Sequence, residues 1–226
     1  MSEQTNPIIS FKNFSFQYRA QKKPTLHDIN LDIYPGERVL IAGPSGSGKS
    51  TLAACINGLN PFSNPGACTG TLTVDGVDAP HSSIFELSAH VGTVLQDPDG
   101  QFIGLTVGED IAFALENSCT PQDEMHAITR HAAELVGIEN HLGYAPHELS
   151  GGQKQRLCIA RALLRRPKIL ILDDSTSAVD TKTDAKIRAG LASYLPNTTK
   201  LIIAQRISSV QDADRILVLD NGQING

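Results

Sequence analysis

Nine residues near the start of the chain have the types and spacing that bind nucleotide phosphates. Glycines let a backbone curl until several N–H groups point into one hollow. Lys49 can reach the outer phosphates, and the Ser50 hydroxyl can hold Mg²⁺, with Thr51 as a weaker contact. In order the residues are Gly43, Pro44, Ser45, Gly46, Ser47, Gly48, Lys49, Ser50 and Thr51, which complete the pattern G-x-x-x-x-G-K-[ST].

The segments around this loop are those that a phosphate site requires. The short apolar run 39–42 predicts a buried strand before the loop, and residues 50–58 predict a helix after it. The N-terminus of that helix adds a positive dipole where the phosphates would lie. A glycine-rich turn that binds nothing is the alternative, and the strand–loop–helix order disfavours it.

Other polar residues directly follow apolar runs that predict buried strands. They are Gln96, Gln205 and the pair Asp173 and Asp174. Ligands of open α/β sheets bind at the carboxyl ends of the strands. We therefore expect Asp173 to hold the metal, directly or through water, together with Ser50. A helix cap or a turn is the simpler explanation of an acidic residue at this place.

Two further segments are candidates for contact with a nucleotide. The segment Ser150-Gly151-Gly152-Gln153 has the form of a capping box at the start of a helix. Two glycines in a first turn are unfavourable for a helix, so we infer that another molecule approaches the backbone there. Tyr18 precedes a polar stretch, and its ring could stack on an adenine. For this residue taken alone, packing within a sheet is the simpler interpretation.

Strands alternate with helices along the chain, which is typical of an α/β domain with a largely parallel core sheet. Residues 8–18 predict an antiparallel strand in an edge hairpin with 31–33, and 70–78 predict a strand with a tight Asp-Gly turn. A helix is expected from Pro121 to Val136. Its apolar face would contain Ala127, Ile128, His131, Ala132, Leu135 and Val136. Further helices are expected at 150–164 and 182–195, and a last strand at 216–219.

Composition narrows the class of protein. The chain has 226 residues and 40% hydrophobic content, enough for one sizeable core. Its net charge of -5 disfavours general nucleic-acid binding. The four cysteines are irregularly spaced, which favours reduced thiols in the cytosol over a disulfide framework. The sequence has no signal peptide and no apolar run long enough to span a membrane, so work at a membrane would need a partner.

From about Ile9 to Ile224 the sequence resembles the nucleotide-binding domain of ABC transporters. The segment 149–153, Leu-Ser-Gly-Gly-Gln, is the signature motif of that family as it stands. The resemblance implies that Ser150, Gly151, Gly152 and Gln153 bind the γ-phosphate of an ATP held on the opposite subunit of a head-to-tail dimer. It implies a metal-sensing role for Gln96, which also touches the membrane partner, and adenine stacking by Tyr18. It places Asp180 in a loop that crosses the dimer interface.

The resemblance also implies the architecture. We expect a P-loop NTPase core at 8–95 and 165–226, with an antiparallel β subdomain, and a helical signature subdomain at about 97–164. The cofactors would be ATP and Mg²⁺. The expected partners are a second ABC ATPase subunit and integral membrane subunits, at the cytoplasmic face of the membrane.

Two positions depart from the pattern of the family. Asp174 stands where the family usually has the Glu that polarises the attacking water, and Gln205 stands where it usually has the switch His. Gln205 can donate a hydrogen bond to a γ-phosphate, but more weakly than a cation would. We expect this site to bind Mg-ATP well and to hydrolyse it slowly. A heterodimer, in which the intact signature completes the partner's site, is preferred to a homodimer.

The class of transporter stays open on the sequence alone. The stretch 96–110 resembles the ATPases of energy-coupling-factor importers for vitamins and metals, whereas 172–214 resembles the degenerate half of a heterodimeric exporter. A fusion of two related domains near 160–170 would also explain this. A soluble GTPase would need a base-reading motif that is missing, and a small-molecule kinase gives no reason for the signature. A soluble ABC-type ATPase, or a scaffold that binds ATP without turnover, remains an alternative.

Asp174→Glu and Gln205→His, singly and together, are expected to raise the ATP turnover rate. A longer carboxylate would reach the attacking water, and an imidazole would restore a donor that can become cationic. Nucleotide affinity should change little. Single-turnover rates and nucleotide titrations check this, and an unchanged turnover rate would mean that another defect, such as failed dimerisation, limits the site.

Overall fold

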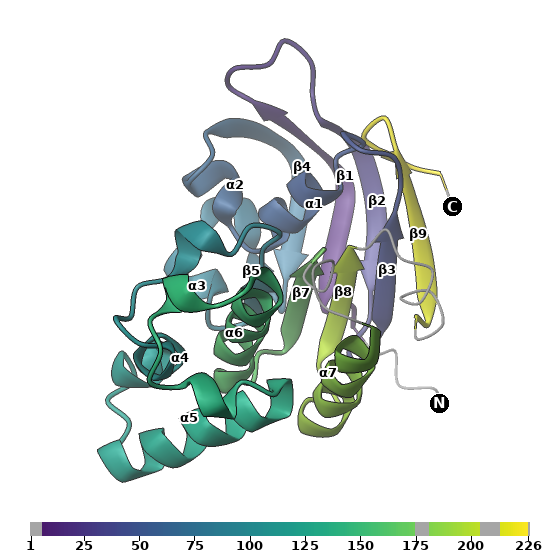
Figure 1. Ribbon diagram of the computed structural model, residues 1–226. Coiled ribbons are helices and arrows are strands. Elements are labelled where there is room, and N and C mark those ends of the chain that lie inside the picture. Colours follow the sequence, from purple (N-terminus) through teal and green to yellow (C-terminus); the bar gives the residue numbers. More distant parts are fainter. Residues whose placement is uncertain (1–5, 175–180, 204–212, 226) are drawn as a thin grey trace. The chain divides into compact units, whose positions relative to one another are not determined.

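The computed structural model describes residues 6–174, 181–203 and 213–225 (Figure 1). Contacts between residues divide the chain into two units. The core unit comprises 1–93, 168–173 and 197–226, and the helical unit comprises 94–167 and 174–196. The predicted partition at 8–95, 97–164 and 165–226 stays a prediction. It differs from these units at 174–196, because the helix of that segment packs against a helix of the helical unit.

The core unit contains an antiparallel sheet of four strands, ordered β2-β1-β4-β5. Strand β1 (Ile9–Tyr18) pairs with β2 (Leu26–Ile33) and also with β4 (Gly66–Val74), which turns into β5 (Val77–Asp78). The predicted hairpin of β1 and β2 is thus confirmed. Of these two strands β2 lies at an edge of the sheet, whereas β1 lies between β2 and β4. Phe11, Phe14 and Phe16 of β1 are buried and anchor this sheet in the core.

The second sheet has the order β10-β9-β3-β8-β7-β6. Strand β3 (Arg38–Ala42) lies parallel to β8 (Thr199–Ile203) and to β9 (Arg215–Asp220), and β8 lies parallel to β7 (Ile169–Asp173). The predicted parallel core is therefore confirmed. The remaining strands are β6 (Val91–Val94) and β10 (Gln223–Ile224), of which β10 returns antiparallel to β9 after a turn at Asn221 and Gly222.

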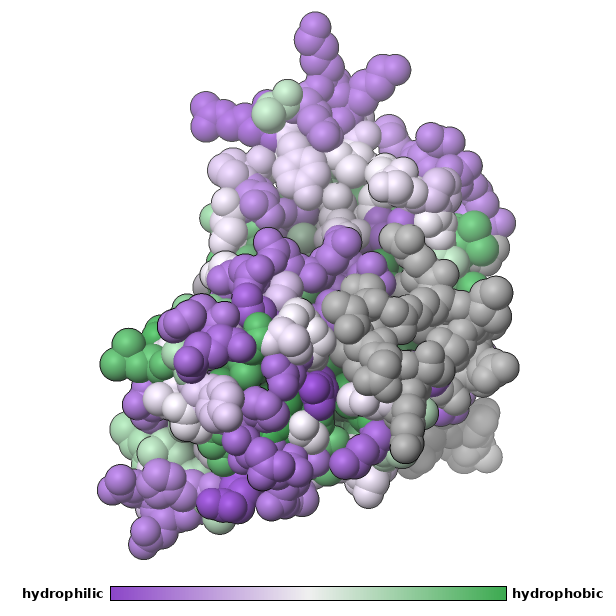
Figure 2. Space-filling view, in the orientation of Figure 1, coloured by the Kyte–Doolittle hydropathy of each residue, from purple (hydrophilic) through white to green (hydrophobic). Residues whose placement is uncertain are grey.

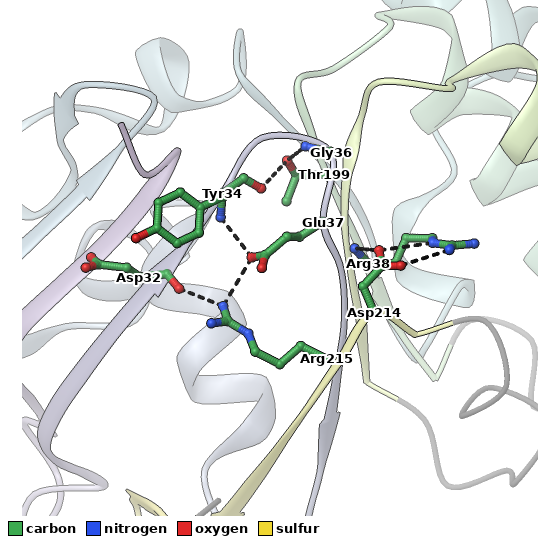
Figure 3. Close-up of polar contacts among 8 residues, drawn as sticks. All are labelled: Asp32, Tyr34, Gly36, Glu37, Arg38, Thr199, Asp214 and Arg215. Atoms are coloured by element: carbon green, nitrogen blue, oxygen red, sulfur yellow. Dashed lines mark hydrogen bonds and ion pairs between the residues drawn. The ribbon is translucent and has the colours of Figure 1, made fainter. Parts of the chain in front are cut away.

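Polar contacts fasten the amino ends of the parallel strands (Figure 3). Asp214 accepts hydrogen bonds from the backbone N–H of Arg38 at 2.8 Å and from its guanidinium at 2.9 Å. These bonds lower the pKa of Asp214. Arg215 donates to Glu37 at 3.2 Å, and Thr199 Oγ1 accepts from the N–H of Gly36 at 2.9 Å. The register of β3, β8 and β9 is set at this end, opposite the phosphate loop.

The described residues of the core unit also form short helices. The predicted helix after the loop is α1 (Lys49–Ile56). The others are α2 (Leu59–Phe62), η1 (Ala79–His81) and α3 (Ile84–Leu87).

The helical unit is built from helices that pack on one another. They are α4 (Val107–Glu116), α5 (Gln122–Val136), α6 (Gly151–Leu164) and α7 (Thr181–Tyr194), with short 3₁₀ helices η2 (Asp99–Gln101), η3 (Glu139–His141) and η4 (Pro146–Glu148). No helix within the described residues is long and apolar enough to cross a membrane.

The predicted face of α5 needs correction. Ala127 and His131 are exposed, and the buried stripe contains Thr129, Ala132, Ala133 and Val136 instead. Because α4, α6 and α7 all contact α5, the small residues turn inward where helices pack closely. His131 lies against the ring of Tyr194 with centroids 5.6 Å apart. Pro121 is the N-cap of α5 and not part of its first turn.

Asp75 links three segments of the core unit. It lies in the β4–β5 turn with φ 48° and accepts hydrogen bonds from His90 Nδ1 at 2.5 Å and from Lys168 Nζ at 2.7 Å. Burial raises the pKa of Asp75, but the hydrogen bonds from Lys168 and His90 together outweigh burial and lower it. A carboxyl with a lowered folded-state pKa stabilises the fold above its unfolded pKa of about 3.9. That stability is lost as the pH falls through the folded-state pKa.

Asp75→Asn should therefore cost about 1.5–3 kcal/mol at neutral pH, the range for a hydrogen bond to a charged group. The loss should shrink as the pH falls below about 4, because the wild-type carboxyl is then protonated as well. Denaturant unfolding at pH 7 and pH 3 measures both. Asp28→Asn is the matched control, since Asp28 is exposed and has the same φ of 48°. An equal cost of Asp75→Asn at the two pH values would contradict the linkage.

Candidate functional site

The loop after β3 has a backbone that only glycines allow. Gly43, Gly46 and Gly48 have φ of 149°, 78° and 106°. A Cβ on Gly43 would lie 2.0 Å from the carbonyl oxygen of Leu219 in β9, so the loop rests directly on the neighbouring strand. Gly48 is the N-cap of α1 and makes no side-chain cap. The first N–H groups of α1 therefore remain available to an anion.

Side chains of the loop fit a phosphate ligand. Ser47 is buried, and among the described residues its Oγ lacks a hydrogen-bond partner. Lys49 Nζ folds back and donates to the carbonyls of Gly43 at 2.9 Å and Pro44 at 2.7 Å. A buried hydroxyl without a partner is costly, and a phosphate oxygen would satisfy it. Ser45 and Ser50 are exposed at the surface of the loop.

Asp173 ends β7 and is buried, with 6% of its surface exposed. In the register of the parallel sheet it pairs with Ile203 of β8, and Ile203 also pairs with Ile41 of β3. Asp173 therefore lies at the same edge as the start of the phosphate loop, about 10 Å from β3 by strand spacing. In the described part of the chain no three His, Cys, Asp or Glu side chains gather into a metal cluster.

Tyr18 lies beside the helix that follows the loop. Its hydroxyl is 3.2 Å from Thr51 Oγ1, and its ring packs edge-on against Phe16 with centroids 4.8 Å apart. The ring is half-buried. Tyr18 thus packs in the sheet and lies next to the helix that follows the phosphate loop, and adenine stacking stays a prediction. Thr51, predicted as a weak phosphate contact, directs its hydroxyl to Tyr18.

The signature segment lies in the helical unit, where Ser150 is the N-cap of α6. The predicted capping box is present, since Ser150 Oγ accepts from the N–H of Gln153 and Gln153 Oε1 accepts from the N–H of Ser150 at 2.8 Å. Ser150 and Gly151 are exposed, and a Cβ on Gly151 would meet no atom within 4 Å. Gly152 follows in the same turn. A methyl group at 151 would therefore meet no described atom of this unit.

Four contacts of α6 could not be read from the sequence. Gln153 Nε2 lies 2.9 Å from His141 Nε2, which fixes the orientation of the capping amide. Lys154 pairs with Asp99 at 2.6 Å. Arg161 donates to the carbonyl of Gln101 at 2.6 Å and lies 3.3 Å from the fully buried Asp110. These contacts tie α6 to the segment that follows Gln96, and the spacing of the residues gave no signal for them.

The structure distributes the predicted site residues as follows. The core unit brings together the loop 43–51, Tyr18 and Asp173. The helical unit holds the signature residues, Gln96, which is exposed two residues after β6, and Asp174, whose φ is 46°. Gln205 and Asp180 lie outside the described residues.

The family model described as ABC transporter matches residues 26–177, which include both the phosphate loop and the signature segment. The chain belongs to the ABC transporter family. Members of this family have ATP-binding domains that act as ATPases, and the predicted P-loop NTPase fold is confirmed.

Relatives of this ABC domain match nearly all of it. A protein of Lactiplantibacillus plantarum named as an ABC transporter ATP-binding protein is 52% identical over 223 residues, which cover 96% of this chain and 39% of that protein. The chain thus spans well under half the length of the curated relatives it matches. One relative matches across both predicted parts, so the hypothesis of a fusion near 160–170 finds no support.

Solved structures of ABC proteins also match the chain. A dimeric ATP-binding cassette bound to ADP and Pi has a TM-score of 0.87 at 28% identity, covering 96% of this chain and 97% of that one. The cbiO1 protein of Clostridium perfringens, part of the transporter complex cbiONQ, has 0.82 at 30%, covering 98% and 88%. A bacterial Atm1-family exporter with ATP bound has 0.84 at 31%, covering 98% and 38%.

Gly43→Ala should abolish nucleotide binding and cost several kcal/mol of stability, because its Cβ cannot fit against the Leu219 carbonyl. Gly36→Ala is the control, since Gly36 has a φ of 81° with open space around it. It should cost only the strain of a left-handed alanine, about 1–2 kcal/mol. Thermal unfolding and nucleotide titration measure both variants. Equal costs would mean that the loop does not rest tightly on β9.

Proposed function

We propose that the chain binds Mg-ATP at the loop 43–51 and serves as the ATP-binding subunit of an importer of the energy-coupling-factor type. The observation that supports ATP binding best is the loop itself. Its glycine backbone leaves the N–H groups at the start of α1 uncapped, and the Ser47 hydroxyl is buried without a partner. Asp173 lies at the same edge of the sheet.

In this proposal each residue of the loop has a separate task. Backbone N–H groups from Gly46 to Ser50 bind the phosphates, and Lys49 exchanges its two loop carbonyls for the outer phosphate oxygens. Ser50 and Asp173 would hold Mg²⁺, and Gln96 would sense it. The metal would neutralise charge between the outer phosphates when bound. Tyr18 would stack on the adenine.

The signature segment would act on a nucleotide held by a second ABC subunit. Its two glycines are at the start of α6, and Ser150 and Gly151 are exposed, as contact across a dimer requires. Asp180 would lie in the loop that crosses the interface. The dipole and N–H groups of α6 would then bind the partner's γ-phosphate. We prefer a heterodimer because the signature segment is intact, whereas Asp174 and Gln205 would make the chain's own site slow. The intact signature would then complete the faster site of a different partner.

Slow hydrolysis at the chain's own site follows from Asp174 and Gln205. A carboxylate one methylene shorter than Glu would sit farther from the attacking water, and a neutral amide would stabilise the γ-phosphate less than a cation. This proposal concerns the rate of hydrolysis and not nucleotide affinity.

Import is supported by the stretch 96–110, which resembles the ATPases of energy-coupling-factor importers, and by the likeness to cbiO1, which is part of the complex cbiONQ. Ile103 and Leu105, which follow Gln96, are 61% and 82% exposed and would suit contact with a membrane subunit. Figure 2 shows a largely hydrophilic face with some apolar surface. The protein would then lie at the cytoplasmic face of the membrane. The degenerate half of a heterodimeric exporter is the second candidate, supported by the likeness to the Atm1-family exporter.

Hydrolysis should appear only when a second ABC chain, bearing Glu and His at the two departed positions, is added. Three forms of this chain separate the roles: wild type, Lys49→Ala and Gly151→Ala. Wild type and Lys49→Ala should activate the partner to a similar degree, because each offers an intact signature. Gly151→Ala should lower the partner's rate tenfold or more, since the added methyl blocks close approach of the γ-phosphate.

The matched control is stability. An alanine at 151 has open space in this chain and improves helix propensity, so Gly151→Ala should unfold no earlier than wild type. If Gly151→Ala activates the partner fully while Lys49→Ala does not, the signature does not act in trans. Co-purification with an integral membrane subunit, as against nucleic acid, separates transport from a soluble ABC-type ATPase.

A further inference from the structure

Asn60 is buried in the core unit, with only 2% of its surface exposed. It lies in the short helix α2, where its own backbone is extended, with φ -106° and ψ 126°. A buried amide is costly unless hydrogen bonds satisfy it, so its partners indicate what it does for the fold.

The amide of Asn60 joins α1 to Tyr18. Its Nδ2 lies 3.3 Å from Tyr18 Oη, 3.4 Å from the carbonyl oxygen of Thr51 and 3.8 Å from Cys55 Sγ. Its Oδ1 accepts a hydrogen bond from Asn64 at 3.0 Å. Thr51 and Cys55 are four residues apart and therefore lie on one face of α1. The amide thus bridges the helix that follows the phosphate loop and the last residue of β1.

Two polar contacts hold the Tyr18 hydroxyl. The amide nitrogen of Asn60 can only donate, so Tyr18 Oη accepts from it. Thr51 Oγ1 lies 3.2 Å from the same oxygen, and either hydroxyl can be the donor there. The ring is held at a second place by Phe16, against which it packs at 86°. The plane of Tyr18 is therefore fixed by Asn60 and Thr51 at one end and by Phe16 along the ring.

We propose that Asn60 is a positioning residue that orients the Tyr18 ring for stacking on the nucleotide base. The inference rests on the proposed function, in which Tyr18 stacks on the adenine of ATP. Stacking depends on the orientation of the two rings. In the hydrogen bonds described for it, Asn60 meets the loop 43–51 only at the carbonyl oxygen of Thr51, and it contacts none of the groups proposed to bind the phosphates. Its effect is therefore on the base part of nucleotide affinity and not on the phosphate part.

The experiment compares two ligands that share phosphates and differ in the base. Dissociation constants of Mg-ATP and Mg-tripolyphosphate are measured by calorimetry for the wild-type chain, Asn60→Leu and Tyr18→Phe. Leucine has a similar volume and cannot donate, and phenylalanine keeps the ring but removes the hydroxyl. Each variant should weaken ATP binding about three- to tenfold, the range for one lost hydrogen bond, and change tripolyphosphate binding less than twofold. The double variant should lose no more than the larger single effect, because both changes break one link.

Asn57→Leu is the matched control. Asn57 lies at the end of α1 in the same connection to α2, and its side chain contacts Thr93 and the backbone of Leu59 but not Tyr18. It should leave the ratio of ATP to tripolyphosphate affinity unchanged even if it lowers stability. Thermal unfolding reports whether each variant folds, and where Asn60→Leu does not fold, the result with Tyr18→Phe decides.

The other outcomes are distinct. If Asn60→Leu weakens the binding of ATP and of tripolyphosphate equally, the inference is overturned, because Asn60 then supports the phosphate loop. If the variant weakens the binding of neither ligand, the inference is overturned as well, because Asn60 then has no effect on nucleotide affinity. Equal affinity of the wild-type chain for ATP and tripolyphosphate overturns it too and leaves phosphate binding intact. Absence of binding of either ligand to the wild-type chain contradicts the proposed function itself.

Discussion

The contact between the phosphate loop and strand β9 constrains the rest of the core unit. Gly43 lies so close to the carbonyl oxygen of Leu219 that a Cβ there would be 2.0 Å away. Such an approach requires β3 and β9 to be in register, which the pairs from Val39–Arg215 to Ala42–Val218 provide. The strands hold the loop open toward solvent, and the glycines let its backbone curl. In the proposed function, phosphate binding is thus a property of backbone packing, to which Lys49 and Ser50 would add charge and a hydroxyl.

The two ends of the parallel strands differ in their polar contacts. At the amino end, ion pairs and hydrogen bonds of Arg38, Asp214, Glu37 and Arg215 fix the strands. These side chains are partly exposed, so each pair contributes little to stability, but their bonds to backbone N–H and C=O groups specify register. At the carboxyl end the loop and Asp173 are left for a ligand. Stability and function are separated along the strands because parallel strands present all their carboxyl ends at one edge.

The helical unit has its own polar framework. Asp110 is fully buried and accepts the N–H groups of Ile103 and Gly104, while Arg161 of α6 lies against it. This arrangement ties the segment after Gln96 to the helix that begins at the signature. A movement of that segment would therefore displace α6 through the contacts of Asp110 and Arg161. In the proposed function, such coupling would connect the surface that follows Gln96 to the phosphate held by another subunit.

The sequence by itself determined the phosphate loop, the capping box at Ser150 and the order of strands and helices, because each depends on local residue types. Glycine spacing and apolar runs report backbone conformation directly. Only the tertiary structure decided which face of α5 is buried, since small residues such as Ala133 turn inward where other helices pack. It also decided the polar links of Asn60, His141 and Asp110. Their partners lie on other segments of the chain, and no local pattern records a contact that forms only when those segments meet.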